Sequence, residues 1–441
     1  MKPYKVLLFI ACVMACLAVL CIVLPGRIAF ADRELRWPTL AEVTGGWEMS
    51  GTASLNDDLS EIPEIPESPV DTLPSLPGRT EQRQTPPPVS VDTTSDSRIF
   101  LQAFYASLAE TDRRTVRVLH YGDSQIEEDR MTQQLREQLQ NRYGGSGAGL
   151  LPLVQTIPTR TVRQELIMNG RKITPQQGPR RFLVYGPKRD QRADGLYGVM
   201  GQTAVLNDSL VSGSETITAV CTPLDGRPPY THWQVFADST IAFTFSGDSV
   251  HLNGRGHVYA LSQESETGVI VDNIPMRGCL GLVFTKMDST QLSAFFRDRN
   301  VRLIILQYGG NAIPSNKNPG TIQAIVKGLR EQVRFLRACA PEASILFIGP
   351  SDMLTQTDGE WQTYPMVPYM DRLLRKMALE EHIAYFSLFR WMGGAGSMAH
   401  WQEIGLAGSD GVHFTRSGAR KAGNAVAEWI ISGIDDFTID E

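Results

Sequence analysis

The feature that most constrains the fold of this chain is an alternation of short apolar runs with longer amphipathic stretches. Residues 116–121 form the first apolar run, and Met131, Leu135 and Leu139 then recur at helical spacing. The alternation resumes later, with strands expected at residues 268–274, 301–307, 343–348 and 384–388 and helices expected at residues 289–297, 321–339, 367–381 and 417–431. Such strands are buried on both faces by the helices between them. The sequence therefore predicts a three-layer α/β/α, flavodoxin-like parallel sheet.

This alternation stops between residues 158 and 265. The interval contains alternating β-branched and aromatic residues, as in residues 240–245 (TIAFTF), and many Gly, Asp and Asn turns. We expect a β-rich module here, inserted between the first and second strands of the sheet, where a surface loop tolerates it. The α/β domain then consists of residues 98–157 and 266–441.

The N-terminus carries a targeting or anchoring segment over residues 1–30. Two lysines precede an apolar run of nineteen residues at positions 6–24. Its length favours a retained membrane anchor. Residues 29–31 (Ala-Phe-Ala) form a small-residue cleavage site, so removal as a signal peptide stays open. Attachment of a lipid at Cys16 is the third alternative. Positive charge before the run predicts that the rest of the chain lies outside the cytoplasm. With the segment retained, the protein is anchored in the inner membrane and faces the periplasm. With the segment cleaved, it is periplasmic or secreted.

Residues 31–97 are expected to form a disordered linker. Eight prolines lie between Pro63 and Pro88, and few residues in the segment are apolar. Such a composition cannot bury enough surface to offset the entropy of ordering, and the prolines favour an extended spacer.

The charge balance and the cysteines exclude several kinds of function. The net charge of −6 and the pI of about 5.8 give no basic excess, so no nucleic-acid partner is expected. Outside the N-terminal run the cysteines are Cys221, Cys279 and Cys339, too far apart for a zinc site and expected to be buried free thiols. We expect neither a metal nor a cofactor.

Residues suited to nucleophilic catalysis follow the predicted strands. Ser124 comes directly after the strand at residues 116–121, in the turn Gly-Asp-Ser, and Asn311 follows Gly-Gly after another strand. Asp410 and His413 precede the last helix. A serine hydroxyl needs a base within hydrogen-bond reach, and that base needs an acceptor that fixes its tautomer. Ser124, His413 and Asp410 can fill these three roles.

The order of these motifs resembles that of the SGNH (GDSL-type) hydrolases, and in particular extracytoplasmic Bacteroidetes-type members similar to peptidoglycan and carbohydrate O-acetylesterases. The resemblance implies that Ser124 is the nucleophile, His413 the base and Asp410 its orienting carboxylate. It also implies an oxyanion hole made by the backbone N–H groups of Ser124 and Gly278 and by the side-chain amide of Asn311.

The resemblance covers residues 114–429 apart from the insertion, with two departures from the family pattern. Gln125 replaces the usual Leu after the nucleophile, and Ala312 replaces the usual Asp after the oxyanion Asn. The second change removes the residue expected to support Asn311.

A Gly-rich loop at residues 391–398 lies between Trp391 and Trp401, whose aromatic faces would suit sugar rings near the cleft. The resemblance then implies a serine esterase that removes acyl groups, O-acetyl above all, from cell-wall or surface carbohydrate. The inserted module at residues 158–265 is similar to carbohydrate-binding inserts at the same place in peptidoglycan O-acetylesterases, which implies that it binds carbohydrate. The substrate partner is an acylated polysaccharide or peptidoglycan, and the membrane is a partner if the N-terminal helix is uncleaved. A carbohydrate O-acetyltransferase and a non-catalytic glycan-binding protein on the same fold remain alternatives.

Overall fold

The computed structural model describes residues 27–30, 33–36 and 96–439, with gaps at 156, 169–170, 174–181, 186–202, 207–216, 225–231, 238, 255, 317 and 358. The chain divides into two compact units, residues 1–78 and 79–441. Within the described ranges, none of the helices has the length and apolar character of a membrane span. The apolar run at residues 6–24 lies outside these ranges.

In the first unit the described residues form a small antiparallel hairpin. β1 (Arg27–Phe30) pairs with β2 (Arg33–Arg36), with Arg27 opposite Arg36. Only two residues separate the strands, which is the commonest length of a hairpin connection. These strands fall at the end of the predicted N-terminal segment and the start of the predicted linker, and linker residues 37–95 lie outside the described residues.

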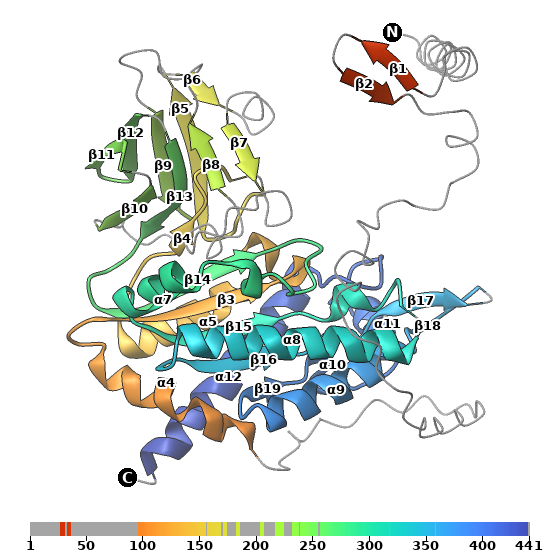
Figure 1. The fold of residues 1–441 in the computed structure, drawn as a ribbon. Coiled ribbons are helices and arrows are strands. Elements are labelled where there is room, and N and C mark those ends of the chain that lie inside the picture. The colour runs from red at the N-terminus through yellow and green to blue at the C-terminus, as the bar shows by residue number, and fades with distance from the viewer. Residues whose placement is uncertain are drawn as a thin grey trace. The chain divides into compact units, whose positions relative to one another are not determined.

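The second unit is built on a five-stranded parallel sheet, as predicted (Figure 1). Its strands are β3 (Thr115–Gly122), β14 (Gly268–Pro275), β15 (Val301–Gln307), β16 (Ser344–Ile348) and β19 (Ala384–Phe386). They lie in the order β14-β3-β15-β16-β19, so the second strand along the chain flanks the first at one edge. This is the flavodoxin-like order 2-1-3-4-5, in which ligands bind beyond the carboxyl ends of the strands.

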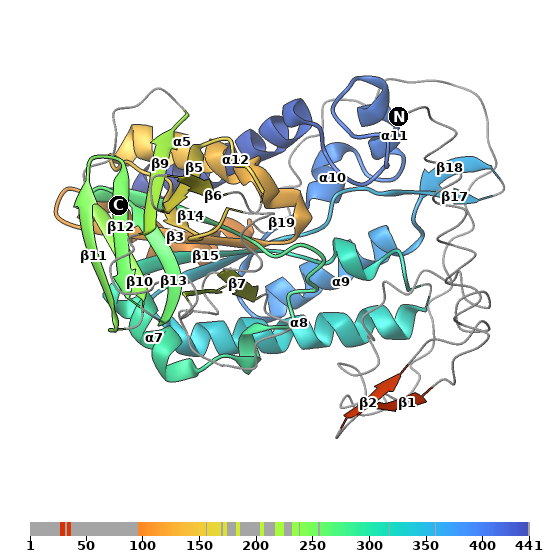
Figure 2. The same ribbon diagram turned by 90° about the horizontal axis from the view of Figure 1, so that it is seen from above.

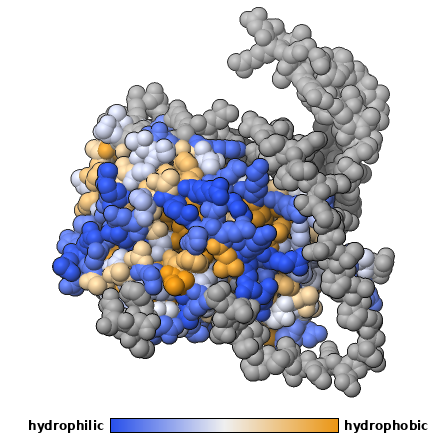
Figure 3. All heavy atoms as spheres, turned by 60° about the horizontal axis from the view of Figure 1, so that its bottom comes forward, coloured by the Kyte–Doolittle hydropathy of each residue, from blue (hydrophilic) through white to orange (hydrophobic). Residues whose placement is uncertain are grey.

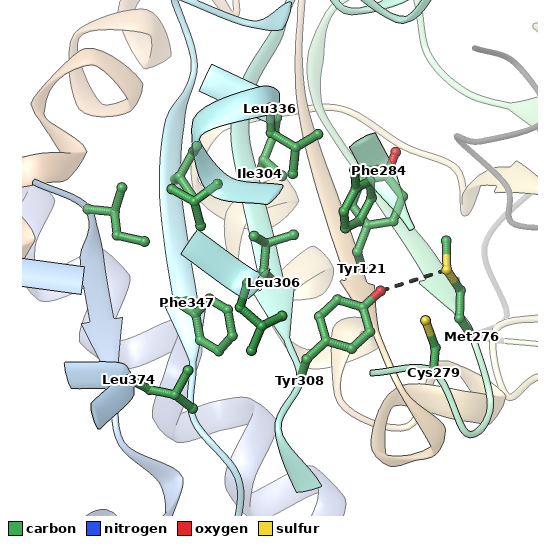
Figure 4. Close-up of a cluster of buried hydrophobic side chains, with 14 of the residues drawn as sticks. Tyr121, Met276, Cys279, Phe284, Ile304, Leu306, Tyr308, Leu336, Phe347 and Leu374 are labelled. Carbon is green, nitrogen blue, oxygen red and sulfur yellow. Dashed lines mark hydrogen bonds between the residues drawn. The ribbon is translucent and has the colours of Figure 1, made fainter. Parts of the chain in front are cut away.

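Helices cover both faces of the sheet, because successive side chains of each buried strand point to opposite faces. Val118 and Ile305 pack into one apolar cluster, whereas Leu119 and Leu306 pack into the other. The first cluster includes side chains of α4 (Gln102–Ser107), α5 (Thr132–Tyr143) and α12 (Arg416–Ile439). The second, part of which is drawn in Figure 4, includes side chains of α7 (Ser289–Asp298), α8 (Pro319–Cys339) and α9 (Met366–Glu380). The three-layer prediction is therefore confirmed.

The region between β3 and β14 holds the expected β-rich module, made of two antiparallel five-stranded sheets. One contains β4 (Gly149–Leu151), β7 (Phe182–Tyr185), β8 (Thr203–Leu206), β10 (Trp233–Ala237) and β13 (Gly256–Gln263). The other contains β5 (Val162–Met168), β6 (Arg171–Ile173), β9 (Ile217–Pro223), β11 (Ile241–Ser246) and β12 (Ser249–Gly254). Side chains from both sheets, such as Leu261 and Leu252, share one apolar core. Because β4 pairs with β13, the pairing of the module begins before residue 158.

A buried ion cluster joins the module to the parallel sheet. Arg117 on β3 pairs with Asp272 on β14 at 2.8 Å and with Glu264, which directly follows β13. The Asp272 carboxylate also accepts a 2.7 Å hydrogen bond from the backbone N–H of Leu150 on β4. All three charged side chains are almost completely buried. Removing one partner would leave a buried charge uncompensated, so the cluster fixes the module against the sheet.

The surface mixes polar and apolar residues. On the face shown in Figure 3, hydrophobic residues form patches between hydrophilic ones.

Cys221, Cys279 and Cys339 are buried free thiols, as predicted.

Candidate active site

The structure brings the three predicted catalytic side chains into one hydrogen-bonded chain. The Ser124 Oγ lies 2.8 Å from His413 Nε2, and His413 Nδ1 lies 2.7 Å from Asp410 Oδ2. An ionised carboxylate can only accept, so the proton of the imidazole lies on Nδ1 and Nε2 is free to accept the serine proton. The arrangement is that of a nucleophile, a base and the carboxylate that fixes its tautomer.

Ser124 is placed by the end of β3. The strand stops at Gly122, where a Cβ would lie 3.0 Å from the side chain of Ile126. The Asp123 carboxylate then accepts from the backbone N–H of Gln125 at 3.0 Å and caps a 3₁₀ helix over Ser124–Asp129. The backbone N–H of Ser124 has no acceptor among the described residues. It is therefore available to an incoming oxygen.

Asp410 and His413 lie on a tight turn before α12. The Asp410 Oδ1 accepts from the backbone N–H groups of Val412 and His413 at 2.9 and 3.0 Å, and Gly411 takes the left-handed conformation with φ of +69°. Partial burial raises the pKa of Asp410, but the hydrogen bonds from His413 and from the turn outweigh burial and hold that pKa below its ordinary value. Asp410 is therefore ionised at neutral pH.

A small pocket opens beside the serine. Its volume is about 80 Å³, and Ser124, His413 and Asn311 all line it. The remaining walls come from Asp123, Gln125, Gln307, Tyr308, Gly310, Pro314, Pro350, Ser351, Met353 and Val412. The predicted triad and the predicted oxyanion Asn therefore meet at one site, at the carboxyl edge of the sheet.

The Asn311 amide is held by two acceptors. Its Nδ2 donates to the Asp123 Oδ2 and to the backbone carbonyl of Cys279, each at 3.2 Å. Asp123 thus supplies a support that the sequence analysis expected to be lost with Ala312. Burial raises the pKa of Asp123 to about 6, although the hydrogen bond from Gln125 and the proximity of His413 oppose it.

Gly278, the third predicted oxyanion donor, lies on an exposed turn after β14 with φ of +69°. The turn is tied to the end of β3, because the backbone N–H of Met276 donates to the carbonyl of Gly122 at 2.7 Å. Gly278 is not among the residues that line the pocket around Ser124. Its contribution to an oxyanion hole stays a prediction.

Gln125, which in the sequence is only a departure from the pattern of the SGNH hydrolases, makes a specific contact in the structure. Its side chain is buried, and its Nε2 donates to the carbonyl of Val412 at 2.7 Å. This bond ties the segment after the nucleophile to the turn that carries His413. A leucine at this position could not make it.

Pro350, Ser351 and Met353 form a wall of the pocket that was not predicted from the sequence. A signal was present, since these residues directly follow β16, and the carboxyl ends of parallel strands meet at one edge of the sheet.

The structure overturns the interpretation of Trp391 and Trp401 as sugar-binding faces. The two indoles contact each other edge to face at 5.5 Å, and Trp401 also packs on Phe414 at 5.1 Å. Trp401 is 4% exposed and Trp391 packs on the same apolar cluster. Both are occupied by core packing, the commoner use of large aromatic side chains.

No protein-family model and no curated protein matches the sequence. Among solved structures, a peptidoglycan O-acetylesterase is similar with a TM-score of 0.60 at 20% identity, over 78% of this chain and 98% of that one. A carbohydrate acetylesterase from Sinorhizobium meliloti is similar over 37% of this chain and 79% of that one, with a TM-score of 0.27 at 16% identity. The first similarity establishes a shared fold.

Proposed function

We propose that this chain, which has the SGNH hydrolase fold, is a serine esterase that removes short acyl groups from carbohydrate. The observation that carries the proposal is the continuous hydrogen-bonded chain from Ser124 through His413 to Asp410, at 2.8 and 2.7 Å, beside a pocket.

The chain of hydrogen bonds sets the direction of proton transfer. His413 Nε2 takes the proton of Ser124 as the serine oxygen attacks the ester carbonyl, and Asp410 stabilises the imidazolium that forms. The tetrahedral intermediate then expels the alcohol, which takes that proton from His413 and leaves an acyl group on Ser124. Water attacks this acyl group with the same base, releases the acid and restores the serine.

The oxyanion that forms in both halves of this reaction needs donors in the pocket. The Ser124 N–H is free to donate, and the Asn311 amide lines the same pocket. Asn311 must exchange or share one of its two bonds, to Asp123 or to Cys279, in order to donate to the oxyanion. One such donor contributes about 2.7 to 4 kcal/mol of transition-state stabilisation.

The size of the pocket supports a short acyl group. A volume of about 80 Å³ is far below the roughly 300 to 1,000 Å³ that encloses a drug-sized ligand. An acetyl group fits such a space, whereas most of a long acyl chain would have to extend out of it. We therefore take O-acetyl as the acyl group that is removed.

We take the substrate to be cell-wall or surface carbohydrate outside the cytoplasm. The fold shared with a peptidoglycan O-acetylesterase over 98% of that chain, at 20% identity, supports the substrate class. The apolar run at residues 6–24, preceded by positive charge, supports attachment to the inner membrane facing the periplasm, or secretion after cleavage.

The test is acetate release by the full chain from 4-nitrophenyl acetate, O-acetylated peptidoglycan and acetylated xylan, comparing wild type with Ser124→Ala. We expect release from the small ester and at least one glycan, with loss of at least a thousandfold in the variant. Release that is equal in the two proteins would exclude Ser124 as the nucleophile. Transfer that requires an acceptor glycan would identify an acetyltransferase instead.

A further inference from the structure

Trp361 differs from the other tryptophans that the structure describes. Its side chain is half exposed, at 50%. The others are buried or packed against aromatic rings: Trp233, Trp391, Trp401 and Trp429. Trp361 has no ring partner among the described residues. An indole is a large apolar surface with a polar N–H, well suited to contact with a ligand.

Trp361 lies on a hairpin at the same edge of the sheet as the triad. The hairpin is made of β17 (Leu354–Thr357) and β18 (Glu360–Thr363), follows β16, and projects from the domain beside α11 (Ser397–Glu403) (Figures 1 and 2). Because β16 and β3 are parallel strands of one sheet, the hairpin and Ser124 both lie beyond carboxyl ends.

The strand register places Trp361 on the hairpin face that meets the triad turn. Trp361 pairs with Gln356, two residues from Leu354, so Trp361 and Leu354 share a face. Leu354 packs against Gly411, since a Cβ on Gly411 would lie 2.9 Å from the Leu354 Cβ. Gly411 lies between Asp410 and His413. Because two residues of a strand span about 7 Å, Trp361 lies about that distance along the hairpin from Leu354.

A glycine-rich segment contacts this face of the hairpin. Thr363, also on the Trp361 face, accepts a 2.8 Å hydrogen bond from the backbone N–H of Gly396. Residues 393–396 read Gly-Gly-Ala-Gly, and Gly393 has a positive φ of +118°. A Cβ added to Gly396 would meet nothing within 4 Å, so the segment is open at the residue that bonds Thr363.

With the acyl group in the pocket of about 80 Å³, the sugar that bears the scissile ester lies at the pocket mouth or beyond it. We propose that Trp361 is a carbohydrate subsite, on which a pyranose ring of the substrate stacks with its C–H face against the indole. This inference rests on the proposed esterase function and specifies how that site selects glycan esters.

The experiment compares two substrates in the full chain. In Trp361→Ala, kcat/KM for O-acetylated peptidoglycan or acetylated xylan falls roughly tenfold, mainly through KM, as expected for one lost aromatic contact. kcat/KM for 4-nitrophenyl acetate stays within about twofold of wild type, because this small ester needs no subsite. Trp361→Phe restores most of the loss. Leu379→Ala, on α9 and 39% exposed, is the control at an exposed hydrophobic residue and changes neither substrate.

Equal kcat/KM on the glycans for wild type and Trp361→Ala would overturn the subsite. An equal loss on 4-nitrophenyl acetate would also overturn it, because Trp361 would then act on the triad or on folding. Failure of the esterase function is seen separately, as equal acetate release by wild type and Ser124→Ala. In that case co-sedimentation with insoluble peptidoglycan and xylan decides: Trp361→Ala binds less than wild type if the subsite exists, and equally if it does not.

Discussion

The side-chain amide of Gln125 donates a 2.7 Å hydrogen bond to the backbone carbonyl of Val412, the residue before His413. The residue after the nucleophile thus holds the turn that carries the base. The glutamine that departs from the family pattern therefore connects the segment of Ser124 with the turn of His413. The two bonded residues are 287 positions apart in the sequence.

Gln125→Leu removes this bond while keeping a similar side-chain volume. We expect kcat for 4-nitrophenyl acetate to fall about tenfold with KM little changed, because His413 is less well placed while the pocket keeps its shape. Steady-state kinetics measures both constants. Unchanged kcat would show that the turn holds His413 without Gln125.

Asp410→Asn keeps the shape of the triad but removes the carboxylate. The amide can donate to the imidazole and favour the wrong tautomer, so we expect kcat to fall by roughly 10³ to 10⁴. The control is Asp112→Asn, an exposed aspartate paired with exposed Arg113, which should leave kcat unchanged. Retention of more than a tenth of wild-type kcat in Asp410→Asn would remove Asp410 from the triad.

Asp123 makes the stability of the fold depend on pH. Burial raises its pKa to about 6, so between about pH 4 and pH 6 the folded state keeps a proton that the unfolded chain releases. The free energy of unfolding therefore falls by about 3 kcal/mol as the pH rises across this window. Above about pH 6, Asp123 contributes no further change with pH.

Asp123→Asn has no such titration. We expect its stability relative to wild type to increase from pH 4 to pH 6, as measured by urea unfolding at several pH values. A constant difference across that range would show that Asp123 does not titrate there.

The buried cluster of Arg117, Asp272 and Glu264 makes a strong prediction for stability. Asp272→Ala leaves the Arg117 guanidinium short of a partner in the interior, and we expect a loss of about 3 to 5 kcal/mol in the free energy of unfolding. Arg113→Ala removes a pair whose side chains are 76% and 73% exposed, and should change stability by less than about 1 kcal/mol. Denaturant unfolding compares the two variants, and equal effects would contradict the assigned role of the cluster.

Much of the α/β domain follows from local sequence. Residues 301–307 predict a strand buried on both faces, and β15 occupies those residues. The helix expected at residues 321–339 begins slightly earlier, at Pro319, because the Asn318 side chain caps it through the N–H of Gly320. Strand and helix identity depend on side chains a few residues apart, so periodicity alone reveals them.

The sequence by itself determined the order of strands and helices and the candidate triad of Ser124, Asp410 and His413, because each motif has its local context at a strand end or before a helix. Only the tertiary structure decided what supports Asn311, what Gln125 contacts, and which of the described tryptophans is exposed. Those answers depend on side chains brought together from distant segments. Local patterns carry no information about such contacts, since packing of the whole domain sets them.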